Sequence, residues 1–147
     1  MISRFELFSA SISGIYRDIQ RIERTEMERY GLKGSHAQCL LAMHRHPDGI
    51  TAARLCEVCD KDKAAVSRMV AELEDKGMIF RSSGSRYRAL LKLTQLGENA
   101  AGHVQQRAKL AVEEAGTGLP EAQRMIMYEA LNLIAENLQH ICAEGLR

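Results

Sequence analysis

Apolar residues recur at helical spacing between Asp62 and Gly77, in the stretch DKAAVSRMVAELEDKG. The apolar positions would form one face of a helix, and they are Val66, Met69, Val70 and Leu73. The polar positions of the opposite face are Lys63, Ser67, Arg68, Glu72 and Asp75. Asp62 is a suitable N-cap because its side-chain oxygen accepts hydrogen bonds from the first free N–H groups. Gly77 readily takes the left-handed conformation that ends a helix, so the pattern predicts a helix over 63–76.

The residues after this helix predict a β-hairpin. A strand-like run covers 78–81, a tip rich in Ser, Gly and Arg covers 82–86, and a second apolar run covers 89–93. A helix, a stop and a hairpin with cationic residues around its tip are the plan of a winged helix-turn-helix. In that plan the helix enters the major groove of DNA, and the hairpin, called the wing, reaches the neighbouring backbone or minor groove. The pattern therefore indicates DNA binding.

Two shorter helices are expected before this one. The first begins with Ser35 as its cap and ends before Pro47, and its inward residues are Ala37, Leu40, Leu41 and Met43. Ile50 is expected to form a one-residue strand bridge. Thr51 is a plausible N-cap for the second helix, whose apolar positions are Ala52, Leu55, Cys56 and Cys59. The three helices near 35–46, 52–59 and 63–76 would form the core of the lobe.

A long amphipathic pattern occupies each end of the chain. From Ile2 to about Tyr30 the apolar residues fall mostly at steps of three and four, and they are Phe5, Phe8, Ile12, Ile15, Ile19, Ile22 and Met27. A stripe this long cannot be buried on a small neighbour alone, so it suggests a subunit interface. Near the C-terminus Thr94 would cap a helix that runs to about Gly116, with Leu96, Ala100, Val104, Ala108 and Ala111 inward.

Pro120 is well placed in the first turn of a last helix. Its apolar residues alternate steps of four and three, as in a coiled-coil seam, and they are Met127, Leu131, Ile134, Leu138 and Ile141. This seam would pair with the N-terminal helix and with the dimer mate. The expected fold is mostly α with a small β-hairpin, in which a winged helix-turn-helix core lies between long N- and C-terminal dimerisation helices.

Composition agrees with a helical protein and predicts a cytoplasmic location. The chain has 147 residues, 46% of them hydrophobic and 27% charged, with no Trp and two Pro. No apolar run approaches the roughly 18 residues of a membrane span. The N-terminus lacks the pattern of a secretory signal, and four cysteines are too few for a disulfide scaffold.

Charge is concentrated in the middle of the chain. The whole chain has a net charge of only +1, but between Lys61 and Lys92 eight Lys or Arg residues accompany four Asp or Glu residues. A basic module on an otherwise acidic frame fits a local phosphate-binding face.

Cys56 and Cys59 have the spacing of a redox or metal motif. Zinc would need a second ligand pair, and the other two cysteines, Cys39 and Cys142, are isolated in sequence. Core packing is the favoured reading, because free Cys behaves as a small hydrophobe at inward helix positions. Thiol sensing stays open as an alternative, and no metal or cofactor is expected.

The order of these elements, with a few specific residues, resembles the MarR (multiple antibiotic resistance regulator) family of dimeric bacterial transcription factors. The resemblance covers Phe5 to about Ile141. Its specific parts are Leu55, Val66-Ser67-Arg68, Leu73-Glu74-x-x-Gly77-Met78-Ile79 and Leu93-Thr94-x-x-Gly97. It implies a DNA-binding lobe at 32–94 and a dimerisation region made of 2–30 and 95–145. The implied protein is a homodimer that binds a pseudo-palindromic operator, as a repressor released by a small aromatic or phenolic effector.

The resemblance also implies site residues. The expected DNA-binding residues are Ser35, His36, Lys63, Ala64, Ala65, Ser67, Arg68, Arg81, Arg86 and Arg88. The expected dimer interface includes Phe5, Phe8, Ile12, Met127, Leu131, Ile134, Leu138 and Ile141. Candidate effector-pocket residues are Tyr16, Arg17, Tyr30, His36 and His103, each of which has ordinary surface or interface packing as the alternative.

Two positions depart from the family pattern. The wing usually carries an Asp-x-Arg element, and the corresponding places hold Ser85 and Tyr87, with Arg86 and Arg88 beside them. Asp60 stands where a Gly often ends the third helix, and Asp tolerates the left-handed region better than most residues.

Two alternatives to an effector-controlled repressor stay open. One is a thiol-switched regulator of the same fold, and the other is a winged-helix module that binds protein partners and does not read DNA. An enzyme is not expected, because the sequence has no Gly-rich phosphate loop, nucleophile motif or metal quartet.

Overall fold

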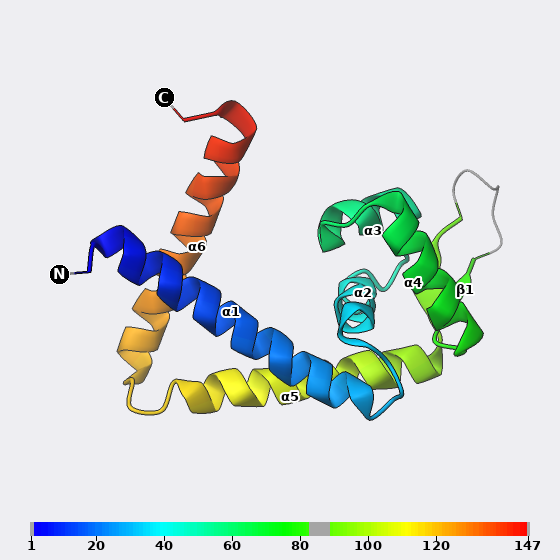
Figure 1. Ribbon diagram of the computed structural model, residues 1–147. Helices are drawn as coiled ribbons and strands as arrows, with labels where there is room; N and C mark the ends of the chain where they lie inside the picture. Colours follow the sequence, from blue (N-terminus) through cyan, green and yellow to red (C-terminus); the bar gives the residue numbers. More distant parts are fainter. Residues whose placement is uncertain (1, 83–88, 147) are drawn as a thin grey trace. The chain divides into compact units, whose positions relative to one another are not determined.

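The computed structural model describes residues 2–82 and 89–146 (Figure 1). Six helices and one hairpin are present in these residues: α1 (Arg4–Glu28), α2 (Gly34–His44), α3 (Ala52–Cys59), α4 (Lys63–Asp75), β1 (Ile79–Arg81), β2 (Leu91–Leu93), α5 (Gln95–Ala115) and α6 (Glu121–Glu144). The strands are antiparallel, with Phe80 opposite Lys92. The predicted fold class, mostly α with a small hairpin, is confirmed.

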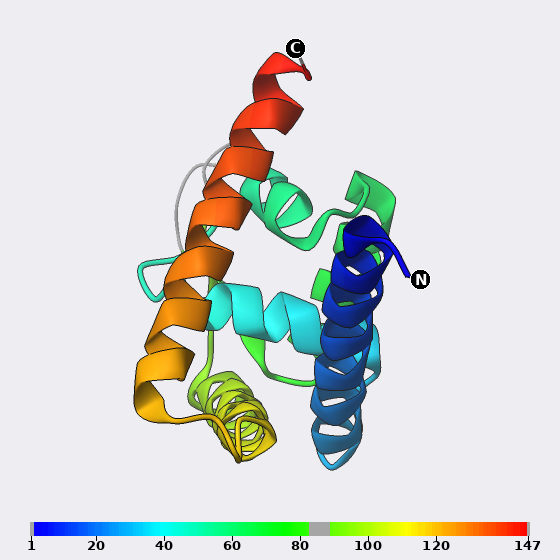
Figure 2. The ribbon, with the colours of Figure 1, turned by 90° about the vertical axis from the view of Figure 1, so that its left-hand side faces the viewer.

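The chain divides into two compact units, Met1–Leu110 and Ala111–Arg147. In the first unit α2 packs against α1, α3 and α4, as Figure 2 shows for the crossing of α1 and α2. Its core contains residues from every helix of the unit and from the hairpin. The fully buried large side chains include Met27, Leu40, Met43, Leu55, Leu73 and Leu91. Ile50 forms the predicted bridge, with Leu91.

Helix ends follow local sequence closely in α3 and α4. The side chain of Thr51 accepts a hydrogen bond from the Arg54 N–H at 3.2 Å, and that of Asp62 accepts one from the Ala65 N–H at 2.7 Å. Gly77 has the predicted left-handed backbone, with φ +72°. Asp60, which ends α3, has φ 51°, so the turn expected to survive the loss of Gly does survive.

Two details of the predicted helices are wrong. Ser35 does not cap α2, because the helix already begins at Gly34 and Lys33 is its N-cap. In α5 Leu96 is exposed, although Ala100 and Val104 are buried as expected. Gly97 takes the inward place in this turn, since a Cβ there would lie 2.1 Å from the Met78 carbonyl oxygen. Thr94 caps the helix as predicted and accepts the Gly97 N–H at 3.1 Å.

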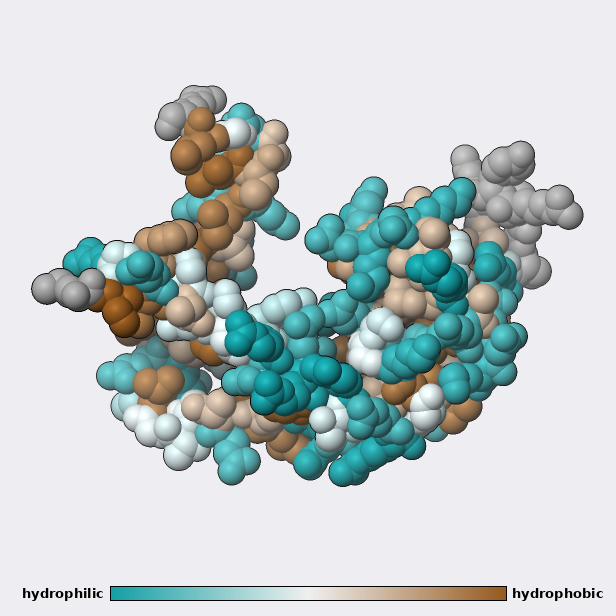
Figure 3. Space-filling model, viewed as in Figure 1, coloured by the Kyte–Doolittle hydropathy of each residue, from teal (hydrophilic) through white to brown (hydrophobic). Residues whose placement is uncertain are grey.

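The second unit consists largely of α6, in which no residue is buried. Hydrophobic side chains are exposed along α6, as Figure 3 shows in brown. Within the first unit the N-terminal half of α1 is similar: Phe5 is 76% exposed, and Phe8 and Ile12 are both 40% exposed. The structure thus leaves the residues predicted to form a dimer interface accessible.

Candidate nucleic-acid interface

Helix α4 has one buried face and one exposed face. Val66, Met69, Val70 and Leu73 are buried, which fixes the rotation of the helix about its axis. The expected DNA-contacting residues on the other side, Lys63, Ala64, Ser67 and Arg68, are exposed, and Ala65 is half-buried. Asp62 holds the first turn of the helix through its cap. The fold therefore presents these side chains together on a rigid element.

A shallow hollow of about 180 Å³ lies beside the exposed face of α4. Its lining residues come from the start of α2, the turn before α4, and α4 itself: Lys33, Ser35, Lys61, Ala65, Arg68, Met69 and Glu72. Three cations and one carboxylate therefore meet on this face. Lys33 and Lys61 were missed as site residues by the sequence reasoning. Each lies just outside a helix N-terminus, a position that could have indicated them.

His36 is inside this lobe and not on its surface. Its side chain is 2% exposed, and both ring nitrogens have partners. The Lys33 backbone N–H donates to Nδ1 at 3.0 Å, and Nε2 lies 2.6 Å from Oε2 of Glu72 on α4. Because Nδ1 accepts a hydrogen bond, Nε2 carries the ring proton and donates to the carboxylate. This hydrogen bond is the largest of the effects that lower the pKa of Glu72. His36 therefore corrects the expectation of a direct phosphate contact: it has no free donor to offer.

The wing is described up to Ser82 and again from Ala89. Ser82 and Leu90 close the described part, with the Ser82 N–H donating to the Leu90 carbonyl at 2.8 Å. Arg81 is exposed, and its Nε donates to Oε1 of Glu74 on α4 at 3.0 Å. Arg86 and Arg88, the other two expected wing contacts, lie outside the described residues. The Thr94 hydroxyl donates to the Gly77 carbonyl at 2.6 Å and joins the base of the wing to the end of α4.

A comparison of the sequence with family models finds a match to the model described as MarR family, over residues 30–88. This segment contains α2, α3, α4 and the first strand of the wing. Residues 30–88 are therefore similar to the MarR family. The resemblance predicted from the sequence is thus supported over this segment, which contains the predicted recognition helix.

Solved structures of MarR-type regulators have the same fold over nearly the whole chain. A MarR transcriptional regulator from Methanosarcina mazei Go1 is 24% identical, with a TM-score of 0.82 over 96% of this chain and 94% of that one. MarR itself is 23% identical, with a TM-score of 0.81 over 98% and 99%. A putative MarR family regulator from Listeria monocytogenes, solved with a 26-mer DNA, is 20% identical, with a TM-score of 0.78 over 100% and 98%. No curated protein sequence matches the chain.

The MarR-type fold does not bring the five candidate effector residues together. Tyr30 and His103 are in edge-to-face contact, with ring centroids 5.9 Å apart. His103 also lies 2.9 Å from Glu26, whose other oxygen accepts from Arg107 at 3.3 Å. Tyr16 lines a different hollow, of about 240 Å³, beside Arg45 and Cys59. Arg17 is exposed, and His36 is buried as described above.

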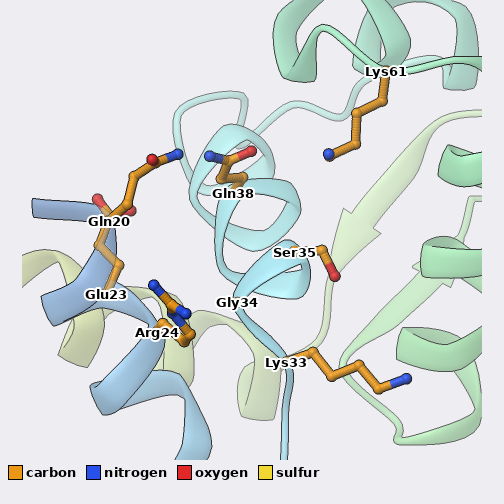
Figure 4. Close-up of a pocket in the computed structure, with 8 residues that line it drawn as sticks. All are labelled: Gln20, Glu23, Arg24, Lys33, Gly34, Ser35, Gln38 and Lys61. Atoms are coloured by element: carbon orange, nitrogen blue, oxygen red, sulfur yellow. The ribbon is translucent and has the colours of Figure 1, made fainter. Parts of the chain in front are cut away.

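A larger hollow, of about 430 Å³, lies between α1 and α2 (Figure 4). Its lining residues are Gln20, Glu23, Arg24, Lys33, Gly34, Ser35, Gln38 and Lys61. Gly34 leaves room for Arg24, since a Cβ at this position would lie 3.1 Å from the Arg24 Cγ. Figure 4 shows Lys61 reaching toward α2 from the side opposite α1. Three cations against one carboxylate, whose pKa is raised by burial, make this hollow suited to an anion.

Two thiols of the lobe, those of Cys39 and Cys59, are poorly suited to sensing. Burial, with a smaller effect of Cys59, raises the pKa of Cys39 to about 12. Burial also raises the pKa of Cys59. Because the thiolate is the reactive form, both thiols are less reactive than a free cysteine. Cys56 packs against the core with Cys59, as favoured from the sequence, and Cys142 is exposed on α6.

Other classes of site were sought in the described part of the chain. Within residues 2–82 and 89–146 no group of three or more His, Cys, Asp or Glu side chains is arranged to hold a metal ion. In the same residues no helix combines the length and the apolar character needed to cross a membrane.

Proposed function

We propose that this protein is a homodimeric repressor that binds a pseudo-palindromic DNA operator in the cytoplasm and is released by a small anionic effector. The observation that carries the DNA-binding part is the cationic face beside α4, where Lys33, Lys61 and Arg68 line one hollow next to exposed recognition-helix residues. Repression requires only that the bound dimer covers its site.

The chemistry of this face matches the major groove. Arg68 can donate two hydrogen bonds to the O6 and N7 of a guanine, and Ser67 can donate to or accept from a base. Ala64 and Ala65 are small, so the helix can approach closely, and their methyl groups suit a thymine methyl. Lys33, Lys61, Lys63 and Ser35 supply phosphate contacts, which give most of the affinity and make it depend on salt.

The dimer part of the proposal rests on the exposed apolar residues of α1 and α6. A second copy of the chain would cover Phe5, Phe8 and Ile12 on α1, and the seam on α6. Two recognition helices in such a dimer would read half-sites about one helical turn, roughly 34 Å, apart. The two-fold symmetry of the protein then predicts a two-fold symmetric operator.

The effector part rests on the hollow between α1 and α2. Lys33, Ser35 and Lys61 line both this hollow and the one beside α4. A bound carboxylate or phosphate would therefore compete with DNA phosphates for the same donors, and an aromatic acid is included in this class. Arg24 lines only the effector hollow and Arg68 only the DNA-side hollow, which separates the two roles.

The DNA-binding proposal is tested by selecting binders from random-sequence duplex DNA at two salt concentrations. We expect enrichment of a two-fold symmetric site, with affinity that falls steeply as salt rises. Arg68→Ala should weaken binding about 5- to 150-fold and relax the base preference at one position in each half-site. Lys109→Ala, which removes an exposed cation from α5, is the matched control and should change little. Salt-insensitive binding that ignores Arg68, without an enriched site, would instead support the protein-partner alternative.

The effector proposal is tested with inorganic phosphate, compared with chloride at equal ionic strength. We expect phosphate to weaken operator binding by the wild type more than chloride does. The Arg24→Gln variant should bind the operator normally and lose this extra sensitivity. If phosphate inhibits operator binding by the wild type and by Arg24→Gln equally, phosphate acts only as a salt and the proposed effector site is wrong.

A further inference from the structure

Arg68 and Glu72 occupy neighbouring positions on the exposed side of α4. They are four residues apart, a spacing at which opposite charges on a helix approach each other and pair. Both line the same hollow beside α4. Among the described residues, however, no ion pair of Arg68 is present, and Glu72 is bound by His36 of α2 at 2.6 Å.

The consequence for DNA reading follows from the chemistry of Arg68. A guanidinium that is paired with a carboxylate has fewer donors for a guanine, and the carboxylate itself repels the phosphates of DNA. The Glu72 side chain is 46% exposed, so it is not locked by packing and would be free to turn toward Arg68 if His36 released it. Lys76, four residues after Glu72 and the C-cap of α4, is the other cation at pairing distance in sequence.

The His36 ring is well fixed for this role. It is 2% exposed, and the Lys33 backbone N–H on Nδ1 sets its tautomer, so that Nε2–H points to Glu72. The hydrogen bond joins the N-terminus of α2, 36 residues earlier in the chain, to the recognition helix. Two elements that both belong to the cationic face are therefore held together by one ring.

We propose that His36 is a positioning residue for DNA recognition: it holds the Glu72 carboxylate on the α2 side, so that Arg68 stays unpaired and available to the operator. This inference rests on the proposed DNA-binding function. It assigns His36 a role through Glu72, with no contact to DNA by the imidazole itself.

Two polar substitutions at His36 distinguish its hydrogen bond to Glu72 from its hydrogen bond to the Lys33 N–H. His36→Gln places an amide N–H where Nε2–H lies and can still hold Glu72. His36→Asn can still accept from the Lys33 N–H, but it is too short to reach Glu72. We expect His36→Gln to bind the operator as tightly as the wild type. His36→Asn should bind roughly two- to fivefold more weakly, because an ion pair at this helical spacing is worth about 0.2–0.5 kcal/mol in each of the two subunits.

The decisive comparison repeats both substitutions in a Glu72→Gln background. The neutral amide introduced there cannot form an ion pair with Arg68, so His36→Asn should then have little effect on operator affinity. If His36 acts only through packing, the loss will be the same in both backgrounds, and the proposal is wrong. The matched control is His44→Asn, because His44 is also on α2 and bonds a different carboxylate, Glu98, at 2.8 Å. Its effect should not depend on which side chain stands at position 72.

A second measurement needs no variant. Nitrogen-15 NMR of the histidine rings in the full-length wild type should show His36 with a protonated Nε2 and an unprotonated, hydrogen-bonded Nδ1. The opposite tautomer, with a protonated Nδ1, would contradict the hydrogen bond from His36 Nε2 to Glu72. A wild type that binds no DNA sequence selectively would overturn the proposed function and this inference together. A wild type that binds DNA but shows no coupling between residues 36 and 72 overturns the inference alone.

Discussion

Helices α2 and α6 show two ways in which this chain uses hydrophobic residues. Seven of the 11 residues of α2 are buried, whereas none of the 24 residues of α6 is buried. Yet α6 carries many large apolar side chains: Met125, Ile126, Met127, Tyr128, Leu131, Leu133, Ile134, Leu138 and Ile141 are exposed. Burial of one such side chain contributes about 1.5–3 kcal/mol. The core around α2 is completed by its own chain, whereas α6, like the N-terminal half of α1, has its apolar surface available for a second chain.

The histidine–carboxylate pairs of the first unit and of α6 differ in the same way as the apolar residues: those of the first unit connect different helices, and that of α6 does not. In the first unit, histidine–carboxylate hydrogen bonds connect helices that are far apart in sequence: His36 to Glu72, His44 to Glu98 and His103 to Glu26. In α6 the corresponding pair is local, from His140 to Glu144 at 3.2 Å within one helix turn. The long-range hydrogen bonds hold the helices of the first unit in one arrangement. The local pair in α6 holds no second helix, so the binding partner of α6 is determined by its apolar seam.

The strongest test of this contrast is to place charge in the seam of α6. Leu131→Glu together with Ile134→Glu would put four carboxylates near the axis of a dimer. We expect a monomer, and operator binding about 10²- to 10⁴-fold weaker, because the two half-sites are then bound independently. Analytical ultracentrifugation and a DNA-binding titration give the two readouts.

The control is Asn132→Glu, which adds one carboxylate to α6 at a position outside the predicted seam. It should leave the dimer intact. A double variant that stays dimeric and binds the operator normally would show that α6 is not the interface.

The next prediction compares the loss of folding stability when a leucine is truncated in the core of the lobe and on the surface of α6. Leu55 is 0% exposed, and Leu55→Ala should lower the free energy of unfolding by about 2–5 kcal/mol, because it leaves a cavity. Leu133 on α6 is 58% exposed and lies outside the predicted seam, so Leu133→Ala should cost about 0.5 kcal/mol or less. Urea unfolding followed by circular dichroism measures both. Equal losses would mean that α6 has a packed core of its own.

Local sequence was sufficient for the features of the fold that depend on neighbouring residues. The caps at Thr51 and Asp62 and the left-handed turns at Asp60 and Gly77 follow from interactions within a few residues. The exposed face of α4 follows from its apolar spacing. These features place the predicted recognition residues correctly on the outside of the lobe.

The candidate site was harder to predict because it depends on contacts across the chain. His36 was expected to contact DNA or to line an effector pocket, and either role would place its ring at the surface. Helix α2, however, is enclosed by α1, α3 and α4, and its buried His is satisfied by a carboxylate 36 residues away. The same long-range packing brings Lys33 and Lys61 to one hollow. No periodicity in the sequence contains that information.

A smaller effect concerns the carboxylate that connects α1 to α5. Glu26 is 6% exposed and is bound by His103 and Arg107. Glu26→Gln should cost about 1.5–3 kcal/mol at pH 7, the range for hydrogen bonds to a charged group. The His103 hydrogen bond is the main reason that the pKa of Glu26 is below its ordinary value of 4.5.

The pH dependence of this effect has a definite sign. A carboxylate with a lowered folded-state pKa stabilises the fold fully above its unfolded pKa, and this contribution is lost as the pH falls through the folded value. The difference in stability between wild type and Glu26→Gln should therefore be constant above about pH 5 and should narrow below pH 4.5. A difference that grows on acidification would contradict this account.

The smallest expected effect concerns the N-caps of α4 and α6. Asp62 caps α4 through a 2.7 Å hydrogen bond, whereas the N-cap of α6 is Pro120, which has no side-chain acceptor. Asp62→Ala should lower stability by about 1 kcal/mol, and Asp62→Asn, which keeps the acceptor, by much less. Because the cap also orients the first turn of α4, Asp62→Ala should weaken operator binding at temperatures where the protein is fully folded. If operator affinity stays unchanged while stability falls, the cap supports the helix without positioning its reading face. In that case the buried side of α4, from Val66 to Leu73, is sufficient to orient the helix.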